Sequence, residues 1–136
     1  MSIRAQNYLP FKGVVFDLDN TLYDEKLYFL EVISVACLYY NLDSGQMAKS
    51  LNRGLLQRSN DIFGDLLREQ GRFTPWLQEA LFQIYRSVTC EIMLESATRS
   101  VLNRLRCAGI RTALLTNGDV RAQRNKVKCL RVDQFV

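Results

Sequence analysis

Two carboxylates, Asp17 and Asp19, are the residues whose types and spacing most clearly suggest chemistry. They follow the apolar run 14–16 and precede the turn-forming pair Asn20-Thr21. A short β-branched and aromatic run that ends in polar residues is typical of a buried parallel strand. Residues two apart on an extended chain point to the same side, and neighbouring carboxylates repel each other unless a cation neutralises them. The pair therefore favours Mg²⁺ at the strand end, although Asp also forms turns there for structural reasons alone.

The residue types exclude several other chemistries. The sequence has no histidine, so catalysis and metal binding by histidine are excluded. The four cysteines, at 37, 90, 107 and 129, fit no metal-binding spacing. We expect them to be reduced, mostly buried thiols of a cytoplasmic protein. Residues 1–11 are expected to form a short arm without the apolar core of a signal peptide, and the most apolar stretch, 27–40, is too short to span a membrane.

Length and charge indicate one small domain, with or without an insert. The chain has 136 residues and a net charge of +4. The basic excess falls in the second half, where it could attract phosphate esters or nucleic acid, but solvated helix faces are the favoured explanation. The basic segment 121–131 has no nucleic-acid-binding motif and no interleaved aromatic residues, which argues against nucleic acid as a partner.

The apolar pattern predicts strands over residues 12–18 and 110–116. Helices are expected over 26–40, 46–59, 61–70 and 75–88, the last capped by Thr74 with Pro75 at its first position. A further helix begins at Ser96 or Thr98 and ends at Gly109, and a basic helix covers 120–130. Residues 132–136 are expected to lead into a third strand.

Two segments resemble motifs of one known family. The segment Asp17-Leu18-Asp19-Asn20-Thr21-Leu22, after an apolar strand, resembles the first motif of the haloacid dehalogenase-like superfamily of phosphohydrolases. Residues 110–118, a strand that ends in Thr116 and is followed by Asn117-Gly118, resemble the second. The resemblance implies an α/β fold: a partial Rossmann-like parallel sheet core with two to three strands, from residues 1–25 and 97–136. It also implies an inserted all-helical cap of the C1 type, from residues 26–96.

The same resemblance implies a function and a role for each motif residue. The protein would be a Mg²⁺-dependent phosphohydrolase acting on a small phosphorylated metabolite, with Asp17 as the nucleophile that forms an aspartyl-phosphate and Asp19 as the acid/base. Mg²⁺ would be held by Asp17 and Asp19, through the Asp17 carboxylate and the Asp19 backbone carbonyl. Thr116, Asn117 and Gly118 would bind the phosphoryl group. Sugar phosphates, nucleoside monophosphates and phosphoglycolate-like acids are all open as substrates, and dehalogenase chemistry ranks lower because Asp19 suits phosphoryl transfer.

Two further motifs of the family, a basic residue after the third strand and a later acidic pair, have no counterpart before the sequence ends. Lys126 lies on the helix before the third strand and ranks low as a substitute, and Asp119 and Asp133 rank lower still as metal ligands. We therefore expect a C-terminally incomplete chain, or a partner chain or dimer that covers the incomplete sheet. The alternative function is a truncated, catalytically incompetent phosphatase-like domain that binds metal or a partner.

Overall fold

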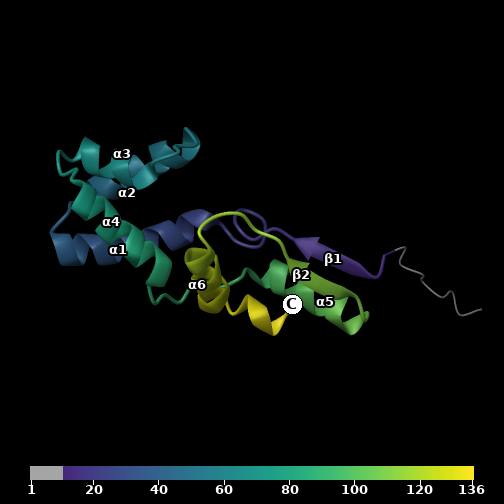
Figure 1. The fold of residues 1–136 in the computed structure, drawn as a ribbon. Coiled ribbons are helices and arrows are strands. Elements are labelled where there is room, and N and C mark those ends of the chain that lie inside the picture. The colour runs from purple at the N-terminus through teal and green to yellow at the C-terminus, as the bar shows by residue number, and fades with distance from the viewer. Residues whose placement is uncertain (1–10) are drawn as a thin grey trace, which may run out of the picture.

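The computed structural model describes residues 11–136, so the predicted N-terminal arm lies almost wholly outside the described residues. Figure 1 shows helices α1–α4 gathered on one side, β1, β2 and α5 on the other, and α6 between them. This mixture of helices and parallel strands confirms the predicted α/β class, whereas the division into core and cap stays a prediction. In chain order the elements are β1 (Gly13–Phe16), α1 (Glu25–Tyr40), α2 (Ser44–Leu56), α3 (Ile62–Glu69), α4 (Pro75–Ser87), α5 (Ser96–Cys107), β2 (Arg111–Leu114), α6 (Val120–Leu130) and the 3₁₀ helix η1 (Val132–Gln134).

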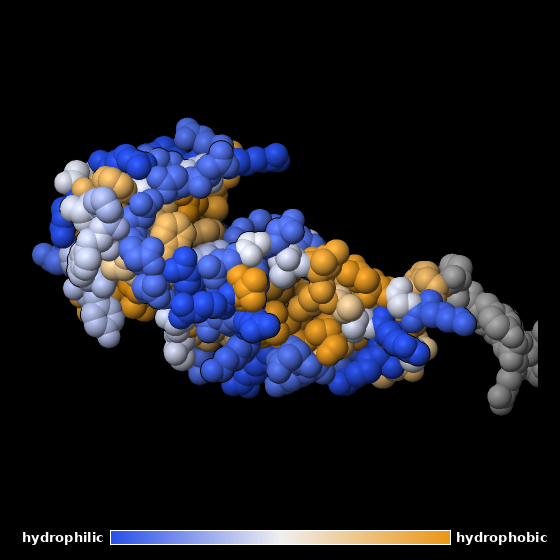
Figure 2. Space-filling view, viewed as in Figure 1, coloured by the Kyte–Doolittle hydropathy of each residue, from blue (hydrophilic) through white to orange (hydrophobic). Residues whose placement is uncertain are grey.

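The two strands pair in parallel, with Gly13 opposite Arg111 and Phe16 opposite Leu114. Each is four residues long, shorter than predicted. The expectation of a buried first strand was wrong for one face, because Val15 is 63% exposed. Burial alternates along both strands, and α5 packs against β2. Figure 2 shows hydrophobic surface over the strands and α5. Whether a partner chain or a second copy covers the open face stays a prediction.

Residues 132–136, which were predicted to lead into a third strand, form the 3₁₀ helix η1 over Val132–Gln134, and the third strand itself stays a prediction. Arg131 ends α6 in the left-handed region, at φ 53°, which turns the backbone. Val132 is then fully buried, and the Phe135 N–H closes the helical turn onto its carbonyl at 3.0 Å. The Thr112 hydroxyl of β2 donates to the Phe135 carbonyl at 3.1 Å. These contacts hold the last residues against β2 as a helical turn.

Side-chain caps fix where most helices begin. Thr74 accepts from the Leu77 N–H at 3.0 Å, and Pro75 is the first helical residue, which confirms the predicted start of α4. All four predicted helices between residues 26 and 97 are present, and α1 and α2 begin one and two residues earlier than predicted. Asp24, Asp43, Asp61 and Asp119 cap α1, α2, α3 and α6 in the same way as Thr74.

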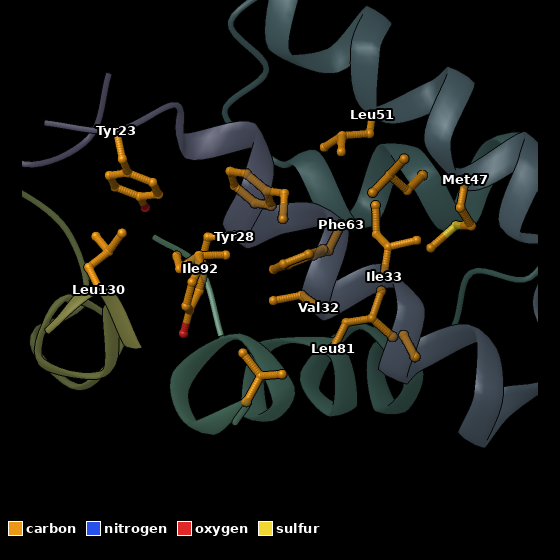
Figure 3. Close-up of a cluster of buried hydrophobic side chains, with 14 of the residues drawn as sticks. Tyr23, Tyr28, Val32, Ile33, Met47, Leu51, Phe63, Leu81, Ile92 and Leu130 are labelled. Carbon is orange, nitrogen blue, oxygen red and sulfur yellow. The ribbon is translucent and has the colours of Figure 1, made fainter. Parts of the chain in front are cut away.

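Aromatic and aliphatic side chains fill the space between α1, α2, α3 and α4. Phe63 lies at the centre, 1% exposed, with the rings of Phe29, Phe82 and Tyr85 within 5.1–5.9 Å of its own. Figure 3 shows part of this cluster, in which side chains from α1 and α4 meet those of α2 and α3. The packed cluster holds α1 and α4 in place, and both of these helices contribute residues to the site described below.

The cysteines partly depart from prediction. All four are free thiols, as expected, but Cys107 is exposed and the other three are only half-buried. Within residues 11–136, no helix is both long and apolar enough to cross a lipid bilayer.

Candidate functional site

The loop after β1 carries the two carboxylates on either side of a buried anchor. Asp17 is exposed, and its Oδ1 accepts a hydrogen bond from the Leu18 N–H at 2.8 Å. Leu18 is fully buried, and its carbonyl accepts from the Leu22 N–H at 3.0 Å. Asn20 adopts a left-handed conformation at φ 56°, which a short polar side chain tolerates. The predicted turn is therefore present, and Leu18 lies between an exposed carboxylate, Asp17, and a half-buried one, Asp19.

The Asp19 carboxylate is held by three side chains. Its Oδ1 accepts from the Tyr23 hydroxyl at 2.7 Å and from Lys126 Nζ at 2.9 Å. Its Oδ2 accepts from Gln123 Nε2 and from Lys126 Nζ, both at 3.0 Å. Two partners on each oxygen fix the orientation of the group and leave it 17% exposed.

The loop after β2 brings the second predicted motif to the same place. The Thr116 hydroxyl donates to Gln123 Oε1 at 3.3 Å, so Gln123 links Thr116 to Asp19. Asn117 and Gly118 are exposed and directly precede the capped N-terminus of α6. The structure thus joins Asp19 and Thr116 through one residue and sets Asn117 and Gly118 beside a helix start, where backbone N–H groups favour anions.

Lys126 is a charged residue at this site that was not predicted to contact Asp19. It is fully buried, and its Nζ also lies 3.1 Å from Glu25 Oε1. The rings of Tyr28 and Tyr85 lie 5.3 and 5.1 Å from the ammonium. Burial by itself disfavours the ammonium, but Tyr85 and Asp19 beside it outweigh this effect and raise the pKa of Lys126 above its ordinary value.

Two neighbours of this network also have raised pKa values. Burial raises the pKa of Glu25, and Lys126 opposes the shift only in part. Burial, followed by the hydrogen bond to Asp19, raises the pKa of the Tyr23 hydroxyl, so this group stays a neutral donor at physiological pH.

A signal for the burial of Lys126 does exist in the sequence, because it lies between Ala122 and Leu130 on one face of α6, at a spacing of four.

The oxygen atoms at this site could bind Mg²⁺ with few protein ligands. Mg²⁺ commonly binds one or two carboxylates and completes its shell with water and substrate phosphate. Asp17 offers an exposed carboxylate, whereas the Asp19 side chain is engaged, which leaves its backbone carbonyl as the fitting donor. Within residues 11–136, no three acidic or cysteine side chains cluster as a metal site. Asp119 and Asp133, the other two candidate metal ligands, belong to no such cluster. Asp119 caps α6 and pairs with Arg86 at 3.0 Å, and Asp133 is exposed.

A cavity of about 580 Å³ opens beside the loop that follows Asp19. It lies between the start of α1 and the end of α2, and five of its seven lining residues are polar or charged. Its lining residues are Asn20, Asp24, Glu25, Lys26, Asn52, Leu55 and Leu56. The cavity shares Glu25 with the Lys126 network, so it adjoins the site.

The sequence was also compared with known proteins. A family model described as haloacid dehalogenase-like hydrolase matches residues 11–135. No curated protein matches the chain.

Proposed function

Because the chain belongs to the haloacid dehalogenase-like hydrolase family, we propose that it is a Mg²⁺-dependent phosphohydrolase acting on a small phosphate monoester. The observation that carries this proposal is the link from Thr116 through Gln123 to Asp19. It joins a hydroxyl suited to a phosphoryl oxygen to a carboxylate suited to proton transfer, in a site that also contains the open carboxylate of Asp17.

In the first proposed step, the Asp17 carboxylate attacks phosphorus and the ester P–O bond breaks. The leaving oxygen takes the proton carried by the protonated form of Asp19, which becomes the carboxylate that Lys126 holds, and the phosphoryl group remains on Asp17. In the second step, Asp19 takes a proton from water, the water oxygen bonds to phosphorus, and the bond from phosphorus to Asp17 breaks. The exposure of Asp17 supports its role as the attacking group, because a substrate reaches it without displacing protein side chains.

The phosphoryl oxygens would be bound by the Thr116 hydroxyl and by backbone N–H groups of Asn117 and Gly118. The N-terminus of α6 adds the favourable end of an eleven-residue helix dipole. Mg²⁺ held by the Asp17 carboxylate and the Asp19 carbonyl would neutralise charge, so that an anion can approach a carboxylate.

The leaving group would occupy the cavity between α1 and α2. Asn20, Asn52 and Lys26 offer it amide and ammonium donors. This lining suits a small polar alcohol, such as a sugar or a hydroxy acid, better than a large apolar one.

One observation favours binding without turnover as a second candidate function. Both Asp19 oxygens are occupied by protein donors, and no third metal-ligating acid accompanies the pair in the part of the chain that the structure describes. A domain of this kind would bind metal or a phosphorylated partner through Asp17 and the loop after β2.

Hydrolysis of p-nitrophenyl phosphate separates the two candidates. We expect release of nitrophenol with Mg²⁺, loss of the activity with a chelator, and loss in Asp17→Asn. Asp43→Asn is the matched control, because Asp43 caps α2 and Asn also caps helices well. Equal rates for a folded Asp17→Asn protein and the wild type would refute the enzyme proposal in favour of binding.

A further inference from the structure

Two side chains of α6, Gln123 and Lys126, stand one turn apart and both reach Asp19. Gln123 is 8% exposed and Lys126 is fully buried. On the basis of the function proposed above, we propose that they are positioning residues for the reaction. They hold the Asp19 carboxylate in one orientation and tie it to Thr116 on one side and to Glu25 on the other.

The two ends of the Gln123 amide have distinct partners. Nε2 donates to Asp19 at 3.0 Å, and Oε1 accepts from Thr116 at 3.3 Å. A flipped amide would set its oxygen against the carboxylate, so Asp19 fixes the sense of the amide. Thr116 has a single hydroxyl proton, and a phosphoryl oxygen bound there competes with Gln123 for it. A phosphoryl group bound at Thr116 would therefore change the hydrogen bonding of Gln123, and through it the position of the Asp19 carboxylate.

The backbone of the loop after β2 leaves room for this amide. Gly118 has φ +123°, which residues with a side chain rarely adopt. A Cβ at this position would lie 2.9 Å from Gln123 Nε2, closer than real contacts allow. A side chain at position 118 would therefore require the Gln123 amide to move from its place beside Asp19.

Lys126 closes the loop that joins β1 to α1. Asp19 lies near its beginning and Glu25 is the first residue of α1, and the same ammonium contacts both at 2.9–3.1 Å. The rings of Tyr28 and Tyr85, from α1 and α4, flank the ammonium and exclude water from it. Loss of this clamp would free the loop and with it the direction of the Asp19 carboxylate.

Kinetics of Gln123→Met and Lys126→Met test the proposal, with Lys128→Met as the matched control. Lys128 lies two residues further along α6 and is exposed. With p-nitrophenyl phosphate, whose nitrophenolate leaves without a proton, the second step still needs Asp19 to take a proton from water. We therefore expect kcat to fall about 10- to 100-fold in the first two variants and KM to stay within about threefold, since misplacing a proton-transfer group costs turnover rather than binding. We expect Thr116→Val to show the opposite signature, with a raised KM. If Lys126→Met does not fold, Gln123→Met decides, because it leaves no unpaired charge.

The side-chain amide signals of Gln123 in ¹H–¹⁵N spectra provide a readout without turnover. They should shift in Lys126→Met and on addition of inorganic phosphate to the wild type, and stay in place in Lys128→Met. Wild-type kcat in Gln123→Met, or signals that do not respond to Lys126→Met, would overturn the inference. If the wild type itself shows no hydrolysis that depends on Asp17, the proposed function fails and so does the positioning role in a reaction. The spectra then still report whether α6 holds Asp19.

Discussion

Replacement of Lys126 by methionine is expected to cost about 3–5 kcal/mol of the free energy of unfolding, the usual cost of removing one partner from a buried ion pair. Methionine nearly matches the length of the lysine side chain, so the change removes the charge and leaves little cavity. Lys126 is fully buried, whereas the side chains of Asp19 and Glu25 are 17% and 21% exposed. Without the ammonium, two half-buried carboxylates face each other with no cation between them.

This loss corresponds to a fall in Tm of roughly 10–18 °C, because about 2.1 cal/mol/K of unfolding entropy per residue makes 1 kcal/mol worth ~3.5 °C in a chain of this length. Thermal unfolding followed by far-ultraviolet circular dichroism, at one pH and one salt concentration, measures it directly. Urea denaturation provides the free energy difference independently, provided that the slope m is unchanged.

Two further variants make the measurement decisive. Lys128→Met removes the same charge from the exposed side of α6 and should change stability by less than about 0.5 kcal/mol. The double variant Glu25→Gln/Lys126→Met removes one of the two unpaired carboxylates and should recover about 1–3 kcal/mol. If Lys126→Met lowers Tm by no more than Lys128→Met does, the buried ammonium does not stabilise the fold and the reasoning is refuted.

Three other predictions address the turn glycines, the start of α6 and the apolar cluster. Gly118→Ala should cost about 2 kcal/mol or more and Gly109→Ala only about 1, because both residues have positive φ but only Gly118 abuts Gln123; equal losses in urea denaturation would contradict the contact. The Ala122 N–H and then Arg86 lower the pKa of Asp119 in the folded protein. The ionised Asp119 side chain therefore stabilises the fold fully above pH ~3.9, the ordinary pKa of Asp, and this stabilisation is lost as the pH falls through the folded-state pKa. Urea midpoints should therefore fall less between pH 6 and pH 3 in Asp119→Asn than in the wild type, and parallel decreases would refute this. Phe63→Ala should cost about 3–5 kcal/mol, against less than about 0.5 for Leu56→Ala, which is 85% exposed, and similar losses would show that the aromatic cluster is not the core of the helical part.

Local patterns predicted most of the helices, because their ends are set by residues close in sequence. The Thr74-Pro75 pair begins α4 by bonding and backbone preference within a few residues. The strand positions also followed from local patterns, since an apolar run before Asp17 and another before Thr116 mark the strand ends. Features of this kind need no knowledge of distant contacts.

The contact between Lys126 and Asp19 could not be predicted in this way, because the two residues are 107 positions apart. A lysine on a helix is usually solvated, and only a carboxylate brought from elsewhere makes its burial favourable. The structure after α6 also depends on a contact between residues distant in sequence. An apolar run around Val132 suits a strand, but the left-handed turn at Arg131 and the bond from Thr112 to Phe135 hold it as a helical turn.

The placement of the lysine has a consequence for the proposed reaction. Lys126 neutralises Asp19, whereas within residues 11–136 no lysine or arginine forms an ion pair with Asp17. A phosphate ester that approaches Asp17 therefore meets a negative charge that the described part of the protein does not compensate. An incoming anion needs a positive charge to offset this repulsion. The charge distribution thus places Lys126, a cation of the protein itself, at Asp19. On the function proposed above, neutralisation at Asp17 would fall to the bound Mg²⁺.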